Sequence, residues 1–584
     1  MLYKSLAGKR YLIIMDDMWS IEAWDNTKLF FPKNNSESKI MITTRLSNLA
    51  LQISGSYGLR MNFLDENKSW ELFCKTVFGE VGNCPLELEE IGKTVARNCK
   101  GLPLSVTVIG GLLAKSEKAH GYWKFIADNL SSIVNLEDNK RCLRILYTSY
   151  QELPIHLKPC FLYMGVFPED SMTYVSPLRK LWVAEGFLKP ISGKSLEEVA
   201  EEYLKDLVDR NLIVPLMMGS TGKIKLCSMH DLLRDLCLRE AEKQKFLSSL
   251  EIGQAITIHR RIVVHQISPK DKNDLHSVLH SATLARSLTS DFLEALPLTS
   301  FRLLRVLKRT YSEDIFDLRR GDGYLMEAIF KLVNSQYLAL CANFCFRHAF
   351  PSSMHLLWNL QTLTFRTTSY QIMNAPPEIW KMHHLRHVDV NALHLPNPTT
   401  ATRDEFVLPN LQKMSEIVNF KCCEAVVKRI PNIKKLRICY NDLYSLLYCL
   451  ENLCHSDISS LHYCLKNLGR FQKLESLYFS LRSRVRRSDL VDSLSFPNSL
   501  KKLTLWGCRL QWEDITRKIG PLSLLQVLKL HKDSVIGSEW ETVEGQFCRL
   551  RVLEITDIDD LEYWTVDNSH FPCLHHLYLR HLHN

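Results

Sequence analysis

The feature that most restricts the fold of this 584-residue chain is a regularly spaced series of apolar triplets in its C-terminal half. Each triplet follows the pattern L-x-x-L-x-L with an apolar residue in every L position. The triplets are Leu360-Leu363-Phe365, Leu385-Val388-Val390, Ile433-Leu436-Ile438, Leu474-Leu477-Phe479, Leu500-Leu503-Leu505, Leu525-Leu528-Leu530, Leu550-Leu553-Ile555 and Leu574-Leu577-Leu579. With a weaker copy at Leu411 and Met414, their first positions step by 25, 26, 22, 41, 26, 25, 25 and 24 residues.

A period in the twenties with one short alternating strand per unit is typical of leucine-rich repeats. One unit cannot bury its apolar face alone, so neighbouring units stack around a continuous core. We therefore expect an α/β leucine-rich-repeat solenoid over 300–584, after a linker or first repeats over 251–299. The 41-residue step predicts a degenerate copy near Leu453, and the end of the chain soon after the last triplet predicts a C-terminal truncation.

The x positions of the triplets carry an excess of basic residues. In such strands the L residues face the core and the x residues face the concave surface. The basic x residues are Arg386, Lys434, Lys435, Arg437, Lys501, Lys502, Lys529 and Arg551. Only Asp389, Glu475 and Glu554 oppose these eight. The bias predicts a basic inner face that docks an acidic partner or an acidic part of the same chain, with an ordinary solvated surface as the alternative.

Charge and hydropathy exclude several classes of protein. The 73 basic and 64 acidic residues give a net charge of +9, without the strong basic patch expected of a nucleic-acid-binding protein. The longest near-apolar run, from Leu102 to Ala114, is too short to span a bilayer, which takes about 20 residues. No two of the 18 cysteines have Cys-x-x-Cys spacing, so we expect reduced thiols and no zinc site. These features favour a cytoplasmic protein without an integral membrane segment.

Two apolar strands near the N-terminus end in polar residues. The first, Tyr11–Met15, runs into Asp16 and Asp17, and two carboxylates at the tip of a buried parallel strand suit Mg²⁺ binding and polarisation of a water molecule. The second, Lys39–Thr43, runs into Thr44 and Arg45, and an arginine at a strand tip can sense a terminal phosphate. The pattern indicates part of a nucleotide-binding sheet.

The phosphate-binding loop that such a sheet needs is missing from the sequence. The loop has the pattern G-x-x-x-x-G-K-[ST]. Gly92 and Gly193 each precede Lys and Thr or Ser, but Glu87 and Leu188 occupy the first position of the two motifs. Gly193 precedes a helix predicted over 196–210, which has six acidic and two basic residues and so lacks a basic face for DNA.

The order of several motifs resembles that of plant NB-ARC leucine-rich-repeat disease-resistance proteins, and most of all the late blight resistance protein homologues of nightshades. The matching segments are 8–19 (kinase-2), 39–45, 101–104 (GLPL), 160–170, 181–187 and 229–231 (Met-His-Asp). They occur in family order over some 220 residues and precede the repeats. The family has a signalling region and a phosphate-binding loop before kinase-2, so the resemblance implies an N-terminally truncated chain.

The resemblance implies the following division of the chain. Residues 1–62 would be a remnant of a P-loop-type nucleotide-binding subdomain, 63–130 a helical ARC subdomain and 131–250 a winged-helix ARC subdomain. In this family Asp16 would bind Mg²⁺, Asp17 would polarise the hydrolytic water, and Arg45 would sense the terminal phosphate of ATP. Pro103 would pack on adenine and His230 would contact the β-phosphate of ADP. Each also has a structural reading: Pro103 as a helix breaker, and His230 as an ordinary residue at a helix start.

The implied function is that of an intracellular immune receptor switched by exchange of ADP for ATP. It would sense a pathogen effector, or a guarded host protein, through the repeats and trigger a defence response with local cell death. It would reside in the cytoplasm, free or at the periphery of a membrane, and contacts between its NB-ARC and repeat parts would hold it closed. Because the phosphate loop is absent, we do not expect an independent enzyme. The alternative is a nucleotide-independent interaction module that regulates a full-length receptor.

Overall fold

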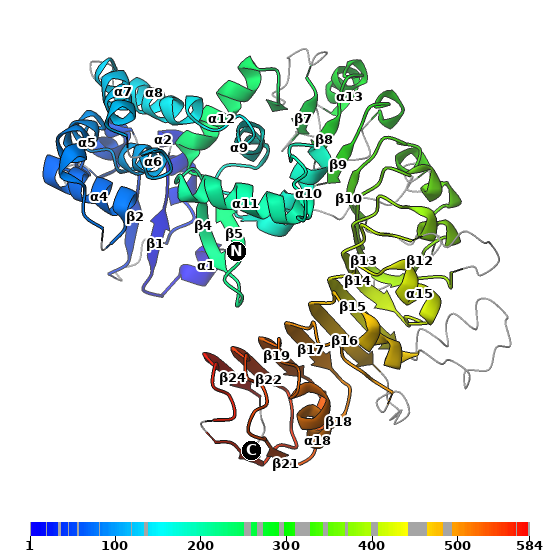
Figure 1. Cartoon of the computed structure of the whole chain (residues 1–584). Coiled ribbons are helices and arrows are strands. Elements are labelled where there is room, and N and C mark those ends of the chain that lie inside the picture. The colour runs from blue at the N-terminus through cyan, green and yellow to red at the C-terminus, as the bar shows by residue number, and fades with distance from the viewer. Residues whose placement is uncertain are drawn as a thin grey trace.

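The structure is a computed structural model. It describes residues 2–18, 20–32, 37–44, 46–54, 58–80, 82–117, 119–133, 138–249, 259–264, 272–290, 297–309, 327–342, 349–367, 372–398, 407–441, 464–482, 493–567 and 569–581. The repeats form a long arc, and the helices of the winged-helix part lie on its concave side (Figure 1). Among the described residues, no helix is both long and apolar enough to cross a bilayer.

The N-terminal segment contains a two-stranded parallel sheet. β1 (Leu12–Met15) pairs with β2 (Lys39–Ile42), accompanied by α1 (Leu2–Leu6), α2 (Ile21–Lys28) and α3 (Ser47–Ser54). The sequence predicted a buried β1, but the side chains of Leu12 and Ile14 are 67% and 60% exposed. That prediction is wrong because the described sheet has only these two strands, whereas burial of a parallel strand requires layers on both faces.

Four helices follow and pack around a common aromatic core. They are α4 (Glu66–Phe78), α5 (Leu86–Asn98), α6 (Pro103–Ala114) and α7 (His120–Ser131). Trp123 is fully buried and meets Phe73 edge to face at 5.7 Å between ring centroids. Gly92 lies inside α5, where an added Cβ would stand 2.8 Å from the ring of Trp70. This glycine therefore serves helix packing and is not part of a phosphate loop.

A winged-helix unit comes next, and it provides one side of the candidate site. Its helices are α8 (Asp138–Gln151), α9 (Lys158–Tyr163), α10 (Val175–Glu185), α11 (Leu196–Asp209) and α12 (Asp231–Lys243). Its small antiparallel sheet has the order β3 (Thr173–Tyr174), β5 (Ile224–Ser228), β4 (Val214–Met218). The apolar faces of α10 and α11 are buried together in one core with α9 and α12.

The repeats form a 15-stranded sheet that is parallel throughout the pairings described. In chain order its strands are β6 (Ser248–Ser249), β7 (Arg261–Val264), β8 (Ser287–Ser290), β9 (Val306–Arg309), β10 (Tyr337–Ala342), β11 (Thr362–Thr367), β13 (His387–His394), β14 (Lys413–Val418), β15 (Lys435–Asn441), β16 (Ser476–Arg482), β17 (Lys502–Trp506), β19 (Val527–His531), β22 (Val552–Thr556) and β24 (His576–Arg580), with β12 (Met373–Asn374) paired to β13. The sheet therefore begins upstream of residue 300.

The apolar triplets build the core of this solenoid, as the sequence predicted. Leu385, Leu436 and Leu503, for example, are at most 1% exposed and belong to one continuous cluster. The prediction of a hidden copy near Leu453 is wrong. Leu453 lies outside the described residues, but β15 pairs directly with β16, and this pairing leaves no strand position between them. The 41-residue step therefore joins two neighbouring strands of the sheet.

The first repeat strands are fixed to the winged-helix unit by a buried polar contact. The Glu185 carboxylate, at the end of α10, accepts hydrogen bonds from Arg261 Nε in β7 at 2.8 Å and from the Ser287 hydroxyl in β8. The guanidinium of Arg261 also lies over the rings of Phe187 and Phe246, at 4.9 Å and 4.2 Å. These contacts set the position of α10 and α11 relative to the concave face.

Candidate functional site

The carboxylates predicted for Mg²⁺ lie where β1 ends, and the end of β2 holds them. The Thr43 hydroxyl donates a hydrogen bond to the Asp16 carboxylate and accepts one from the Asp17 backbone N–H at 3.0 Å. Asp17 has a positive φ of 49°, so the chain turns sharply there. The two strand ends thus present adjacent carboxylates.

Asp17 also lies close to the winged-helix unit. Its carboxylate is grouped with those of Glu169 and Asp231, and one oxygen atom of each lies within 4.8 Å of the others. Asp231 is the first residue of α12, where the positive end of the helix dipole favours a carboxylate. The approach of Glu169 to Asp17 was not predicted from the sequence, because it depends on how the two units pack.

The remaining nucleotide-binding candidates are more dispersed. His230 is exposed and is the N-cap of α12, its ring Nδ1 accepting the Leu232 N–H at 3.2 Å. Pro103 is exposed and is the first residue of α6, so it begins a helix. Arg45 lies outside the described residues. Within the described part of the chain, no hydrogen bond or ion pair joins Asp16, Pro103 and His230.

The residues around β1 fit a nucleotide incompletely. Carboxylate oxygens are suitable ligands for Mg²⁺. Phosphates need a lysine and a cradle of backbone N–H groups, and the sequence has no G-x-x-x-x-G-K-[ST] loop to provide them. Without the positive charge of that lysine and those backbone N–H groups, a cluster of carboxylates would repel a triphosphate. We therefore derive no hydrolytic step for this chain.

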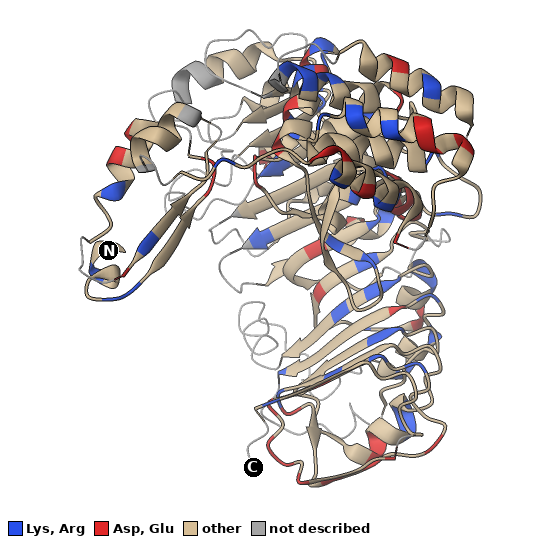
Figure 2. Ribbon diagram, turned by 90° about the vertical axis from the view of Figure 1, so that its left-hand side faces the viewer, with Lys and Arg blue, Asp and Glu red and all other residues tan. Residues whose placement is uncertain are grey.

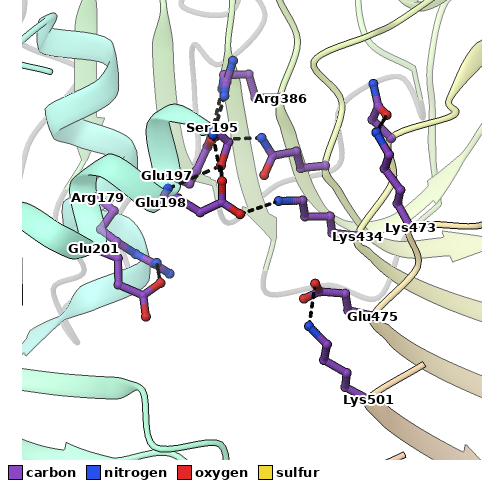
Figure 3. Close-up of polar contacts among 12 residues, drawn as sticks. Arg179, Ser195, Glu197, Glu198, Glu201, Arg386, Lys434, Lys473, Glu475 and Lys501 are labelled. Atoms are coloured by element: carbon purple, nitrogen blue, oxygen red, sulfur yellow. Dashed lines mark hydrogen bonds and ion pairs between the residues drawn. The ribbon is translucent and has the colours of Figure 1, made fainter. Parts of the chain in front are cut away.

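The second candidate site is formed where α11 meets the concave face of the repeats. Ser195 caps α11 through a capping box, in which the Glu198 carboxylate accepts the Ser195 N–H at 2.8 Å. This cap fixes the start of the helix and projects Glu197 towards the strands (Figure 3). Glu197 Oε1 and Oε2 accept Arg386 Nε and Nη2 at 2.7 Å and 2.6 Å, a bidentate pair.

Two further side chains complete the contacts of Glu197. His387 Nε2 lies 3.0 Å from Oε1, and Gln412 Nε2 donates to Oε2 at 2.9 Å. The Glu197 side chain is only 13% exposed and that of Arg386 11%. Burial by itself raises the pKa of Glu197, but the hydrogen bonds from Arg386 and His387 outweigh it and hold that pKa well below its ordinary value. Glu197 is therefore an ionised carboxylate at neutral pH.

The neighbouring carboxylate makes a weaker contact with the repeats. Lys434 Nζ lies 3.1 Å from Glu198 Oε1 (Figure 3). The hydrogen bond from the Ser195 backbone lowers the pKa of Glu198 to about 2, and Lys434 adds to this effect. Glu198 is about half exposed, so its pair with Lys434 contributes less than the buried contact of Glu197. Ser195, Glu197, Glu198, Arg386, His387, Gln412 and Lys434 are hereafter called the α11 clasp.

The other basic residues of the inner face have different surroundings. Lys and Arg recur along successive strands of the sheet (Figure 2). Lys501 pairs with Glu475 at 2.9 Å, Lys529 pairs with Glu554, and Arg437 pairs with Glu416 at 3.7 Å. Arg437 also lies over the Tyr478 ring at 4.3 Å. Lys435 approaches Lys413 and Arg179, Lys502 approaches Lys529 and Lys225, and Arg551 is exposed.

Sequence reasoning overlooked His387, Gln412 and Lys413. All three occupy x positions, His387 in the triplet that starts at Leu385, and the other two in the weak copy at Leu411. The alternation of the strands therefore places all three on the inner face, but the prediction named only charged residues of the strong triplets. A neutral donor such as Gln412 is recognisable as part of a carboxylate site only after the carboxylate has been placed.

Comparisons with known proteins agree with this architecture. Residues 1–81 match the NB-ARC domain model, 166–237 the disease resistance protein winged helix domain, and 279–584 the leucine-rich repeat region. Two putative late blight resistance protein homologs of Solanum demissum are 31% and 32% identical, over 610 and 612 residues that cover 99% and 100% of this chain. A late blight resistance protein of the same species is 30% identical over 604 residues.

The chain spans 44% of the length of each of these three relatives. Among solved structures, a leucine-rich-repeat protein of Leptospira interrogans covers 53% of this chain and 74% of its own, at 17% identity and a TM-score of 0.32. The family-model matches occur in the order that the motifs predicted, and the repeat model alone covers more than half of the chain. The chain therefore belongs to the leucine-rich-repeat proteins that carry an NB-ARC segment and a disease-resistance winged helix.

Proposed function

We propose that this chain acts within an intracellular disease-resistance receptor of plants. Its repeats would bind a pathogen effector or a guarded host protein, and its NB-ARC and winged-helix parts would control a defence response that ends in local cell death. The matches to the NB-ARC and disease-resistance winged-helix models, and the names of the relatives, support this proposal. We propose the cytoplasm as its site of action. We also propose that the nucleotide-binding subdomain ends at residue 62, the helical ARC subdomain at 130, the winged-helix subdomain at 250, and the linker or first repeats at 299.

The observation that carries the proposal is the α11 clasp. Glu197 accepts hydrogen bonds from Arg386 on the concave face, which is the surface we propose for partner recognition. A partner that presents carboxylates to Arg386 and Lys434 would compete with Glu197 and Glu198 for the same donors. Recognition and release of the winged helix would then be coupled, because both cannot use the same donors at once.

The nucleotide part of the proposal concerns Asp16, Pro103 and His230 as contacts of ADP or ATP, Asp16 as the Mg²⁺ ligand, and Arg45 as the sensor of the terminal phosphate. Asp17 is proposed as the catalytic residue only where a phosphate-binding loop is supplied. The NB-ARC match supports nucleotide binding by the family. The approach of Asp17 to Asp231 supports a link between the nucleotide-binding and winged-helix parts.

A chimaera tests the clasp as the element that holds the receptor closed. The 584 residues replace the matching segment of a late blight resistance relative, and the chimaera is expressed in leaves. Glu197→Arg should cause cell death without an effector, and adding Arg386→Glu should suppress it by restoring the pair with reversed charges. Glu202→Arg, on the exposed side of α11, is the matched control and should remain quiescent. A Glu197→Arg chimaera that accumulates normally and remains quiescent would contradict the proposal.

The second candidate function is a nucleotide-independent interaction module. The separation of Asp16, Pro103 and His230, which no hydrogen bond or ion pair joins among the described residues, favours it. Thermal unfolding of the chain with ADP and Mg²⁺ separates the two functions, because a ligand at 100 times its Kd stabilises the native state by about 2.7 kcal/mol. A saturable rise in Tm that His230→Ala reduces supports the switch. An unchanged Tm supports the module.

A further inference from the structure

The residues that directly precede the repeat strands form a row of their own beside the sheet. Before β7, β8 and β9 these residues are arginines: Arg260, Arg286 and Arg305. The Arg286 N–H donates to the Arg260 carbonyl at 2.7 Å, and the Arg305 N–H donates to the Arg286 carbonyl at 2.6 Å. These backbone hydrogen bonds hold the three residues in register across neighbouring strands. They are hereafter called the arginine ladder.

The same row includes three residues of the α11 clasp. Arg386, Gln412 and Lys434 directly precede β13, β14 and β15, and their backbones are joined in the same way, at 2.8 Å and 2.9 Å. Their side chains contact the carboxylates of two consecutive residues, Glu197 and Glu198, at the start of α11. This position of the repeats can therefore present a row of donors to an acidic segment.

The arginine ladder has no such acidic segment among the described residues. None of its three side chains makes a hydrogen bond or an ion pair with any residue that the structure describes. The Glu185 carboxylate attracts Arg286, but its hydrogen bonds come from Arg261 and Ser287. Arg260 is exposed and the other two arginines are partly exposed, so a ligand can reach the row from solvent.

Like charges are concentrated in this row. Neighbouring strands of a sheet lie about 4.8 Å apart, so the three residues span roughly 10 Å. Burial, followed by the charges of Arg305 and Arg260, lowers the pKa of Arg286. An arginine nevertheless stays protonated at neutral pH, so the row carries three positive charges. Carboxylates bound along the row would relieve the repulsion between these charges.

We propose that the arginine ladder binds an acidic segment of a partner protein, which presents two neighbouring carboxylates at the start of a helix. The clasp shows how two such carboxylates contact three consecutive positions of the row. Guanidinium groups bind carboxylates through paired hydrogen bonds, and a row of roughly 10 Å suits several carboxylates more than one compact phosphate group.

The arginine ladder and the clasp are separate sites. β10 and β11 lie between them in the sheet, so a partner can bind the ladder while α11 stays docked. The proposal goes beyond the proposed function, because it requires neither the nucleotide switch nor the release of α11.

The fluorescence anisotropy of a labelled peptide, titrated with the full chain, tests the ladder. The probe peptide has the sequence of residues 195–210, and the control peptide carries Glu197→Gln and Glu198→Gln. The tethered α11 keeps the clasp occupied, because an intramolecular contact has a high effective concentration. At physiological ionic strength we expect saturable binding of the probe and at least about tenfold weaker binding of the control, since each charge-assisted hydrogen bond is worth roughly tenfold in affinity.

Charge-matched variants of the chain locate the bound peptide. Arg286→Gln combined with Arg305→Gln should weaken binding at least about tenfold. Arg302→Gln combined with Lys331→Gln removes two exposed charges outside the ladder and should leave binding as in the wild type. The four positions are exposed or partly exposed, so both double variants should fold, and their thermal unfolding provides the check.

Several outcomes would overturn the proposal. Absence of binding would show that the ladder does not accept an acidic segment, and equal binding of the probe and control peptides would show a general anion surface. Equal losses in the two double variants would show that the ladder has no special role. Weaker binding in Arg386→Gln, without a loss in the ladder variant, would place the peptide at the clasp. Displacement of the probe by a single-stranded oligonucleotide as readily as by unlabelled peptide would assign the row to nucleic acid.

Discussion

The substitution Glu197→Gln tests the central contact between the winged helix and the repeats. It preserves the size of the side chain and removes the charge that Arg386 contacts at 2.6 Å and 2.7 Å. Both side chains of the pair are less than 15% exposed, so solvent screens them weakly. Gln412 and His387 donate to the same carboxylate and would also lose a charged acceptor.

The expected magnitude follows from this burial. Removing one partner of a buried ion pair costs about 3–5 kcal/mol, mostly because the other charge remains buried and unpaired. Here Arg386 can recover its hydration if α11 moves away from the repeats. The cost in the docked state therefore appears as opening of the interface, and about 3 kcal/mol corresponds to a roughly 100-fold change in the opening equilibrium.

Hydrogen exchange is the suitable assay, because a chain of several units does not unfold in one step. Amides in 196–204, 386–398 and 407–418 should exchange faster in Glu197→Gln. Amides in 500–556, remote from α11 in the described contacts, serve as an internal reference. Glu202→Gln is the matched control on the same helix, since Glu202 pairs only with the exposed Lys194 among the described side chains. Equal exchange in Glu197→Gln and Glu202→Gln would show that the Glu197–Arg386 pair does not hold α11 against the repeats.

Three further predictions concern other contacts. Burial lowers the pKa of His387 to about 4, so the contact of α11 with the repeats is most stable above about pH 6.5 and weakens as the pH falls towards 4. Hydrogen exchange of the interface over that pH range should vary less in His387→Gln than in the wild type. An unchanged pH dependence in this variant would assign the effect to another group. Trp540 is stacked between two tryptophans at 4.7 Å and 4.9 Å, so Trp540→Ala should lower the free energy of opening of the last repeats by about 3–5 kcal/mol in hydrogen exchange, whereas the exposed Trp358→Ala should have little effect. Glu185→Gln leaves the buried Arg261 without its charge partner and should increase proteolysis between β6 and β8 relative to Glu202→Gln; equal proteolysis would argue against this contact.

The repeats could be predicted from the sequence because their stabilising interactions recur with the chain period. Leu436 and Leu503 must be buried in any stacking of these units, and each is at most 1% exposed. The concave position of Arg386 and Lys434 follows from the same alternation. By contrast, the burial of β1 was predicted wrongly, because a strand of apolar residues implies a covering layer that the described sheet lacks.

The spacing of apolar residues was enough to predict the solenoid, and the motifs and local composition were enough to predict the order of the segments and two oppositely charged elements: the acidic helix over 196–210 and the basic inner face. The contact between these two elements arises from the packing of whole units, because Glu197 and Arg386 are 189 positions apart and no local pattern encodes the distance between them. Packing also decides which carboxylate each lysine contacts, since Lys501 pairs with Glu475 of a neighbouring repeat whereas Lys434 pairs with Glu198 of α11. Periodic local interactions can be read along a chain, whereas electrostatic contacts depend on the packing of whole units.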